Sequence, residues 1–127
     1  MKKNTYDTAA LQARDSAHHW HPFTDSAALA AEGPRVIVRG EGVWLEDSDG
    51  NRYLDGMAGL WCTQVGHGRT EIADAVHRQM VQLAYSNTFF KTTHEPALEL
   101  AEKLASLTQP HLNRAFFVNS GSEANDT

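Results

Sequence analysis

Apolar residues in the second half of the chain recur at helical spacing. The stripe that follows Thr70 recurs every three or four residues and predicts a helix capped by Thr70. The members of this stripe are Ile72, Ala73, Val76, Met80 and Leu83. A second stripe follows Glu95-Pro96, places proline in the first turn and stops before Pro110, so it predicts another helix. Its members are Leu98, Leu100, Ala101, Leu104 and Leu107.

The first half of the chain changes from helical to β-rich patterning. Residues 7–19 and 27–31 are rich in helix formers and predict two short helices, the second capped by Asp25 and its neighbours and ended by Gly33-Pro34. Three β-rich runs separated by turn residues then predict a three-stranded antiparallel meander. These runs are Val36–Val38, Val43–Leu45 and Tyr53–Leu54.

Residues 55–68 have no periodicity, although they contain many apolar side chains among glycines. The glycines are Gly56, Gly59, Gly66 and Gly68, and the apolar residues include Leu60, Trp61 and Cys62. Two interpretations stay open, a segment that lines a pocket and a packed crossover loop between structural units. Cys62 is expected to be a small buried apolar residue, because the sequence assigns no base that would make it a nucleophile.

The last residues combine an apolar run with a polar turn. Ala115–Val118 predicts a buried strand, and Ser120-Gly121-Ser122 follows it where helix-forming residues begin. Such a turn directs unpaired backbone N–H groups at one point, where a phosphate or another anion can bind. The alternative is a plain helix start in which serine serves only as N-cap. Two helices followed by a strand and this turn predict the beginning of an α/β domain.

Composition and charge narrow the function. The 127 residues are 41% apolar, and the formal net charge of −5 argues against nucleic acid as a partner. No apolar stretch approaches the roughly 18 residues that span a membrane, and the first residues lack the apolar core of a secretion signal, so a cytoplasmic location is expected. The single cysteine, Cys62, excludes an intramolecular disulfide and a multi-cysteine zinc site.

Two segments invite a metal interpretation that the sequence does not favour. His18, His19 and His21 lie close together, but no carboxylate stands at a recognisable metal-site spacing, so the favoured interpretation is a helix end held by aromatic packing and hydrogen bonds. The acidic segment from Asp47 to Gly50 lacks the distal glutamate of a calcium loop and predicts a hairpin turn. The sequence therefore predicts no metal site.

Taken together, five stretches resemble the class III pyridoxal-phosphate aminotransferases, and more narrowly the ω-amino acid (β-alanine):pyruvate transaminases. The matching stretches are His18–Thr24, Gly40–Trp44, Asp55–Cys62, Asn87–His94 and Asn119–Glu123. They follow one another in the order of the family across nearly the whole chain, and their joint occurrence makes the resemblance specific.

The resemblance implies the fold of a fold-type I pyridoxal-phosphate transferase, an α/β fold. Residues 1–65 would contribute to the small domain, and residues 66–127 would begin the large cofactor-binding domain. The chain is expected to be the N-terminal piece of a longer enzyme, a homodimer or homotetramer. The lysine that forms the Schiff base is expected beyond Thr127, so no catalytic residue is assigned here and the piece alone is expected to be inactive.

The resemblance also implies roles for individual residues. The phosphate of pyridoxal 5'-phosphate would be held by Ser120, Gly121 and Ser122. The substrate would be bound by Phe23, Leu60, Trp61, Cys62 and Phe89, the last in a loop that crosses the dimer interface in similar enzymes. The implied reaction moves an amino group from a primary amine or an ω-amino acid such as β-alanine to a keto acid, with pyruvate expected.

Other functions compete with this interpretation. The main alternative is a non-catalytic anion-binding module or an inactive fragment that keeps only this part of the fold. A serine hydrolase is disfavoured, because Gly121-Ser122 lacks the second glycine of a nucleophile elbow. A nucleotide-binding protein is disfavoured as well, because neither the dinucleotide fingerprint nor a P-loop occurs.

Overall fold

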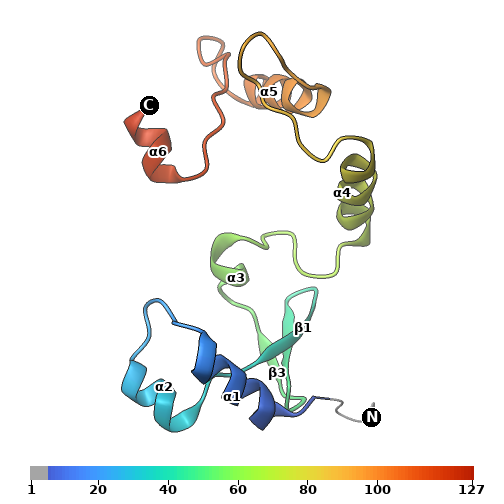
Figure 1. Cartoon of the computed structure of the whole chain (residues 1–127). Coiled ribbons are helices and arrows are strands. Elements are labelled where there is room, and N and C mark those ends of the chain that lie inside the picture. The colour runs from blue at the N-terminus through green and yellow to red at the C-terminus, as the bar shows by residue number, and fades with distance from the viewer. Residues whose placement is uncertain (1–5) are drawn as a thin grey trace. The chain divides into compact units, whose positions relative to one another are not determined.

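The computed structural model describes residues 6–127, which form two compact units. One unit extends to Ala75, and the other is Val76–Thr127 (Figure 1). The boundary between them falls inside a helix, α4 (Thr70–Gln82). The domain boundary expected after residue 65 stays a prediction. No helix within residues 6–127 combines the length and the apolar character needed to cross a membrane.

The first unit begins with two short helices whose caps match the sequence prediction. In α1 (Thr8–His18) the Asp7 side chain accepts a hydrogen bond from the Ala10 N–H group. In α2 (Ser26–Glu32) the Asp25 side chain accepts from two backbone N–H groups, and Gly33 ends the helix with a φ of 73°. A positive φ at the residue after a helix favours glycine, so both ends of α2 follow from the local sequence.

The predicted meander is confirmed as an antiparallel sheet in the order β1-β2-β3. The strands are β1 (Ile37–Glu41), β2 (Trp44–Asp47) and β3 (Arg52–Leu54). Glu41 lies opposite Trp44 at the first turn, and a bulge interrupts the register between Ile37 and Arg39.

The acidic segment forms the turn between β2 and β3, as predicted. The Asp47 carboxylate accepts hydrogen bonds from the Asn51 N–H group at 2.8 Å and from the Tyr53 hydroxyl at 2.7 Å. Thr8 of α1 donates to Asp49 at 2.6 Å and so joins this turn to the helix. Asp47 and Ser48 are the two buried residues among residues 6–127, so the buried centre of this unit is polar.

The second unit contains α5 (Glu95–Leu107) and α6 (Gly121–Asp126) together with the second half of α4. Both predicted amphipathic helices are confirmed, although Thr70 is the first helical residue of α4 rather than its cap. Their apolar stripes are not covered within the described part of the chain: Val76 is 53% exposed and Leu100 is 50% exposed.

The predicted strand Ala115–Val118 is wrong for this structure, because these residues form an extended segment without strand pairing. A strand needs a partner strand for its backbone hydrogen bonds, and residues 76–127 contain no strand that could pair with this segment. Phe116 is 75% exposed, so the segment is not buried either. The apolar pattern was identified correctly, but the neighbours that would turn it into a sheet strand are missing from the described residues.

Candidate functional site

The predicted anion-binding turn forms the start of α6. Ser120 is the N-cap residue in an extended conformation, and the helix begins at Gly121, so the predicted helix start is confirmed. Among the hydrogen bonds of residues 6–127, none is donated by the Gly121 or Ser122 backbone N–H group. The first N–H groups of a helix have no intrahelical acceptor and carry a partial positive charge. Two adjacent donors are therefore available to an anion.

The two serines of this turn have different roles. The Ser120 hydroxyl oxygen accepts a hydrogen bond from the Glu123 N–H group at 3.2 Å. In return, the Glu123 carboxylate accepts from the Asn119 N–H group at 2.8 Å, so the two side chains hold the turn reciprocally. The Ser122 hydroxyl makes no hydrogen bond within the described residues. Ser120 shapes the turn, and Ser122 offers a third donor.

The space next to the Gly121 backbone is open within the described residues. A Cβ atom built at Gly121 meets no heavy atom within 4 Å, so packing within the described residues does not explain the glycine. Glycine at this position lets an anion approach the backbone closely. With the Gly121 and Ser122 N–H groups and the Ser122 hydroxyl as donors, the residues fit the phosphate of a cofactor.

The predicted substrate residues 60–62 lie in and directly after a left-handed helical turn, α3 (Ala58–Trp61), in the first unit. Gly59 has φ 60° and ψ 32°, and Leu60 has φ 62° and ψ 59°, both outside the right-handed helical region. Ala58 and Trp61 also have positive φ angles, of 48° and 68°. For residues other than glycine this conformation costs roughly 1–2 kcal/mol each. The turn therefore needs support from the residues around it.

Asp55 and His67 supply that support. The Asp55 carboxylate accepts a hydrogen bond from the Gly59 N–H group at 3.0 Å and lies 2.9 Å from His67 Nε2. The hydrogen bond with His67 lowers the pKa of Asp55 below its usual value, and the hydrogen bond from the Gly59 N–H group has the next largest effect in the same direction. His67 is itself fixed to the first turn of the sheet, because its backbone exchanges hydrogen bonds of 2.8 and 3.0 Å with Gly42.

Backbone strain is concentrated in the segments that were predicted to bind substrate. The non-glycine residues with positive φ within residues 6–127 are Phe23, Ala58, Leu60, Trp61, Phe90 and Lys91. They belong to three separate segments, each of which contains predicted substrate residues. Strained backbone that the surrounding structure maintains is more frequent at active sites and ligand clamps. This coincidence was not visible in the sequence.

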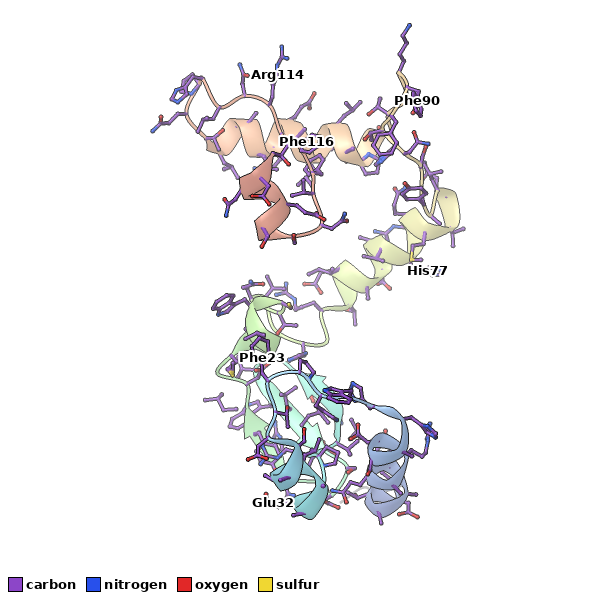
Figure 2. The ribbon with its side chains drawn as sticks, turned by 60° about the vertical axis from the view of Figure 1, so that its left-hand side comes forward. Phe23, Glu32, His77, Phe90, Arg114 and Phe116 are labelled. Carbon is purple, nitrogen blue, oxygen red and sulfur yellow. The ribbon has the colours of Figure 1, made fainter. Side chains whose placement is uncertain are left out.

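The predicted substrate residues lie on the surface of their units. The turn α3 brings Leu60, Trp61 and Cys62 together, with Trp61 80% exposed. Phe23 lies between α1 and α2 and is fully exposed (Figure 2). Phe89, between α4 and α5, lines a cavity of about 250 Å³ with residues of α5 and of the 115–117 segment. The prediction of a buried Cys62 is wrong, because its side chain is exposed beside the turn.

Sequence reasoning missed Asp15, which joins the histidines at the end of α1. His19 Nδ1 lies 3.0 Å from Asp15 Oδ1, and His21 Nε2 lies 2.8 Å from Asp15 Oδ2. The two imidazole rings are in contact, with centroids 4.2 Å apart. Hydrogen bonds from His21 and then His19 lower the pKa of Asp15. The helix end held by ring packing and hydrogen bonds is confirmed, and the four-residue spacing from Asp15 to His19 could have identified the carboxylate.

Comparison with known proteins gives one consistent result. A family model described as aminotransferase class-III matches residues 27–127. The chain is 49% identical over 120 residues to the putrescine–pyruvate aminotransferase of Pseudomonas aeruginosa, covering 94% of this chain and 26% of that protein. It is 44% identical over 109 residues to the β-alanine–pyruvate aminotransferase of the same organism, covering 86% of this chain and 24% of that protein.

The solved structures that resemble this chain are also transaminases. An (S)-enantioselective ω-transaminase from Thermomicrobium roseum matches with a TM-score of 0.90 at 48% identity, covering 96% of this chain and 27% of that one. An ω-transaminase from Pseudomonas jessenii in complex with PMP matches with a TM-score of 0.82 at 36% identity, covering 91% of this chain and 26% of that one. The predicted fold class is confirmed. The chain spans about a quarter of the length of the relatives it matches.

Proposed function

The chain belongs to the class III aminotransferases, a family that depends on pyridoxal 5'-phosphate, and from this premise we propose that the intact protein transfers an amino group from an amine to a keto acid. The observation that carries the proposal is the turn before α6, where the Gly121 and Ser122 N–H groups have no acceptor within residues 6–127 and the space beside Gly121 is open. A phosphate group suits these donors, because it is an anion with several acceptor oxygens.

The finer proposal concerns the two substrates. We propose an ω-amino acid or another primary amine as donor and pyruvate as acceptor. In support, two of the relatives described above are named for pyruvate, and their donors, putrescine and β-alanine, both carry a terminal primary amine. A homodimer or homotetramer and a cytoplasmic location stay predictions.

The residues of this chain would hold the cofactor rather than perform its chemistry. The Gly121 and Ser122 N–H groups and the Ser122 hydroxyl would donate to the phosphate, while Ser120 keeps the turn in shape. Bound pyridoxal phosphate supplies an electron sink for the substrate carbon that carries the amine. No lysine of this chain is proposed to form the Schiff base with the cofactor.

The strained turn would contribute to the wall of the substrate site. Leu60, Trp61 and Cys62 present apolar and aromatic surface from one turn, which would suit the carbon chain of an amine. Phe23 and Phe89 would add aromatic surface from two other segments. Two observations support these substrate roles. One is the family resemblance, and the other is that each of the three segments contains a non-glycine residue with a positive φ angle.

The matched pair Ser122→Ala and Ser120→Ala tests the phosphate site. Removing the Ser122 hydroxyl takes away a hydrogen bond to a charged group, worth about 1.5–3 kcal/mol, so affinity for pyridoxal phosphate should fall roughly 10- to 150-fold. Ser120→Ala removes the cap of α6 and should mainly lower stability, by about 0.5–2 kcal/mol. Absorbance titration of the intact apoprotein with pyridoxal phosphate measures the affinity, and thermal unfolding measures the stability.

Two outcomes would count against the proposal. If Ser122→Ala binds pyridoxal phosphate as tightly as the unsubstituted protein, the cofactor does not use this donor. If the intact protein binds pyridoxal phosphate but transfers no amino group from any primary amine, the non-catalytic anion-binding alternative gains support.

A further inference from the structure

Three potential metal ligands converge at the end of α1. One ligand atom from each of Asp15, His19 and His21 lies within 4.8 Å of the other two. The Asp15 and His21 side chains are only 18% and 22% exposed, whereas the His19 side chain is 60% exposed and free to adjust. None of these three residues has a role in the proposed function.

The backbone holds these side chains in place. Asp15 and His19 are four residues apart, and the His19 N–H group donates to the Asp15 carbonyl at 2.8 Å, so both lie on the same side of the last helical turn. Pro22 favours an extended conformation at His21, which turns the chain away from the helix axis. Both imidazoles can therefore face one carboxylate, as their contacts with Asp15 show.

Two imidazole nitrogens and one carboxylate oxygen form a donor set that zinc and related divalent metals prefer. The nitrogen–oxygen distances are now 2.8–3.0 Å, as expected for hydrogen bonds. Around a tetrahedral zinc ion, with bonds of about 2.0–2.1 Å, the corresponding separation is roughly 3.3 Å. Both histidine–carboxylate separations would therefore have to lengthen by roughly 0.3–0.5 Å for the ion to enter. Each neutral histidine would keep its ring proton on the nitrogen that faces away from the metal.

The space for a fourth ligand is also present. A cavity of about 510 Å³ is lined by all three of these residues, together with Gln12, Ser16 and Trp20. A zinc site with three protein ligands and an open position accepts water or a small anion as its fourth ligand.

We propose that Asp15, His19 and His21 form a binding site for Zn²⁺ or a similar divalent transition-metal ion, with an open fourth position. The ion would fasten the end of α1 to the segment that continues through Pro22 to Phe23. No metal was predicted here from the sequence, because no carboxylate stands at a recognisable metal-site spacing; the fold brings Asp15 to both histidines. The proposal does not depend on the proposed enzymatic function.

The experiment is a zinc titration of the intact protein in competition with a chromophoric chelator, without added pyridoxal phosphate. We expect one equivalent to bind to this site, with affinity reduced at least tenfold in His19→Ala and in His21→Ala. His18→Ala is the matched control, because His18 is a neighbouring histidine of α1 that lies outside the cluster. This control should bind zinc as the unsubstituted protein does.

Asp15→Asn provides a second variant of nearly the same shape, and its zinc affinity should also fall at least tenfold. At the same zinc concentration, the unfolding temperature should rise more for the unsubstituted protein and for His18→Ala than for His21→Ala, because a ligand that binds only the folded state stabilises it in proportion to its affinity. The proposal is overturned if no equivalent binds, or if His18→Ala loses as much affinity as His19→Ala. Neither result would bear on pyridoxal phosphate binding, which is measured separately.

Discussion

A single methyl group at Gly40 tests how the strained turn is supported. A Cβ atom at this position would lie 2.6 Å from His67 Cγ and 2.9 Å from His67 Cβ, both closer than a van der Waals contact allows. The ring cannot move away freely, because His67 Nε2 lies 2.9 Å from the Asp55 carboxylate and the His67 backbone is paired with Gly42. Gly40→Ala should therefore strain the link between the sheet and Asp55.

Inserting a methyl group into a well-packed site costs about 1–3 kcal/mol. The cost should appear as easier local opening of the pairing between Gly42 and His67, whose N–H groups each donate to the carbonyl of the other residue. Hydrogen exchange at these two amides should accelerate roughly 5- to 150-fold, as follows from converting that free energy into an opening equilibrium. The assay is hydrogen exchange of the intact protein, followed by NMR or mass spectrometry.

Gly56→Ala is the matched control. A Cβ atom at Gly56 meets nothing within 4 Å, and its φ is not positive, so exchange at Gly42 and His67 should not change. Unchanged exchange in Gly40→Ala would refute the conclusion that His67 is held between the sheet and Asp55.

Two further predictions concern the first unit. Burial would raise the pKa of Asp47, but hydrogen bonds from Tyr53 and Asn51 outweigh it and lower the pKa to about 2, from an ordinary value of 3.8. Its contribution to stability is therefore fully present above pH 3.8 and is lost as the pH falls toward 2. In an acid titration followed by NMR, Asp47→Asn should lack this transition, and an identical transition in both proteins would contradict the assignment. Asp25→Ala should destabilise α2 by about 0.5–2 kcal/mol and speed exchange at the Ala27 and Ala28 amides, whereas unchanged exchange would show that the cap is dispensable.

The elements that the sequence predicted correctly depend on local chemistry. Asp25 and Gly33 mark the two ends of α2, and a Gly-containing turn separates β1 from β2. The extended segment 115–118 shows the limit of this approach, because a strand also needs a partner and none lies in its unit. Patterning identifies which residues are apolar but cannot supply the neighbouring strand.

The candidate site was predicted only in part for the same reason. Glycine and serine after an apolar run indicated the turn at Gly121, since that signal is local. The left-handed turn was missed, because Leu60 and Trp61 ordinarily prefer a right-handed backbone. Its support by His67 could not be predicted either, because the partner, Asp55, is separated from it by a segment without periodicity.

The most direct test of the proposed function is the absorbance spectrum of the intact protein purified with pyridoxal phosphate, recorded before and after adding β-alanine and then pyruvate. Putrescine serves as a second donor in a parallel series. We predict that the band of the bound cofactor disappears on adding an amine and returns on adding pyruvate. A protein without such a band, or with a band that neither the amines nor the keto acid change, would contradict the assignment of amino-group transfer.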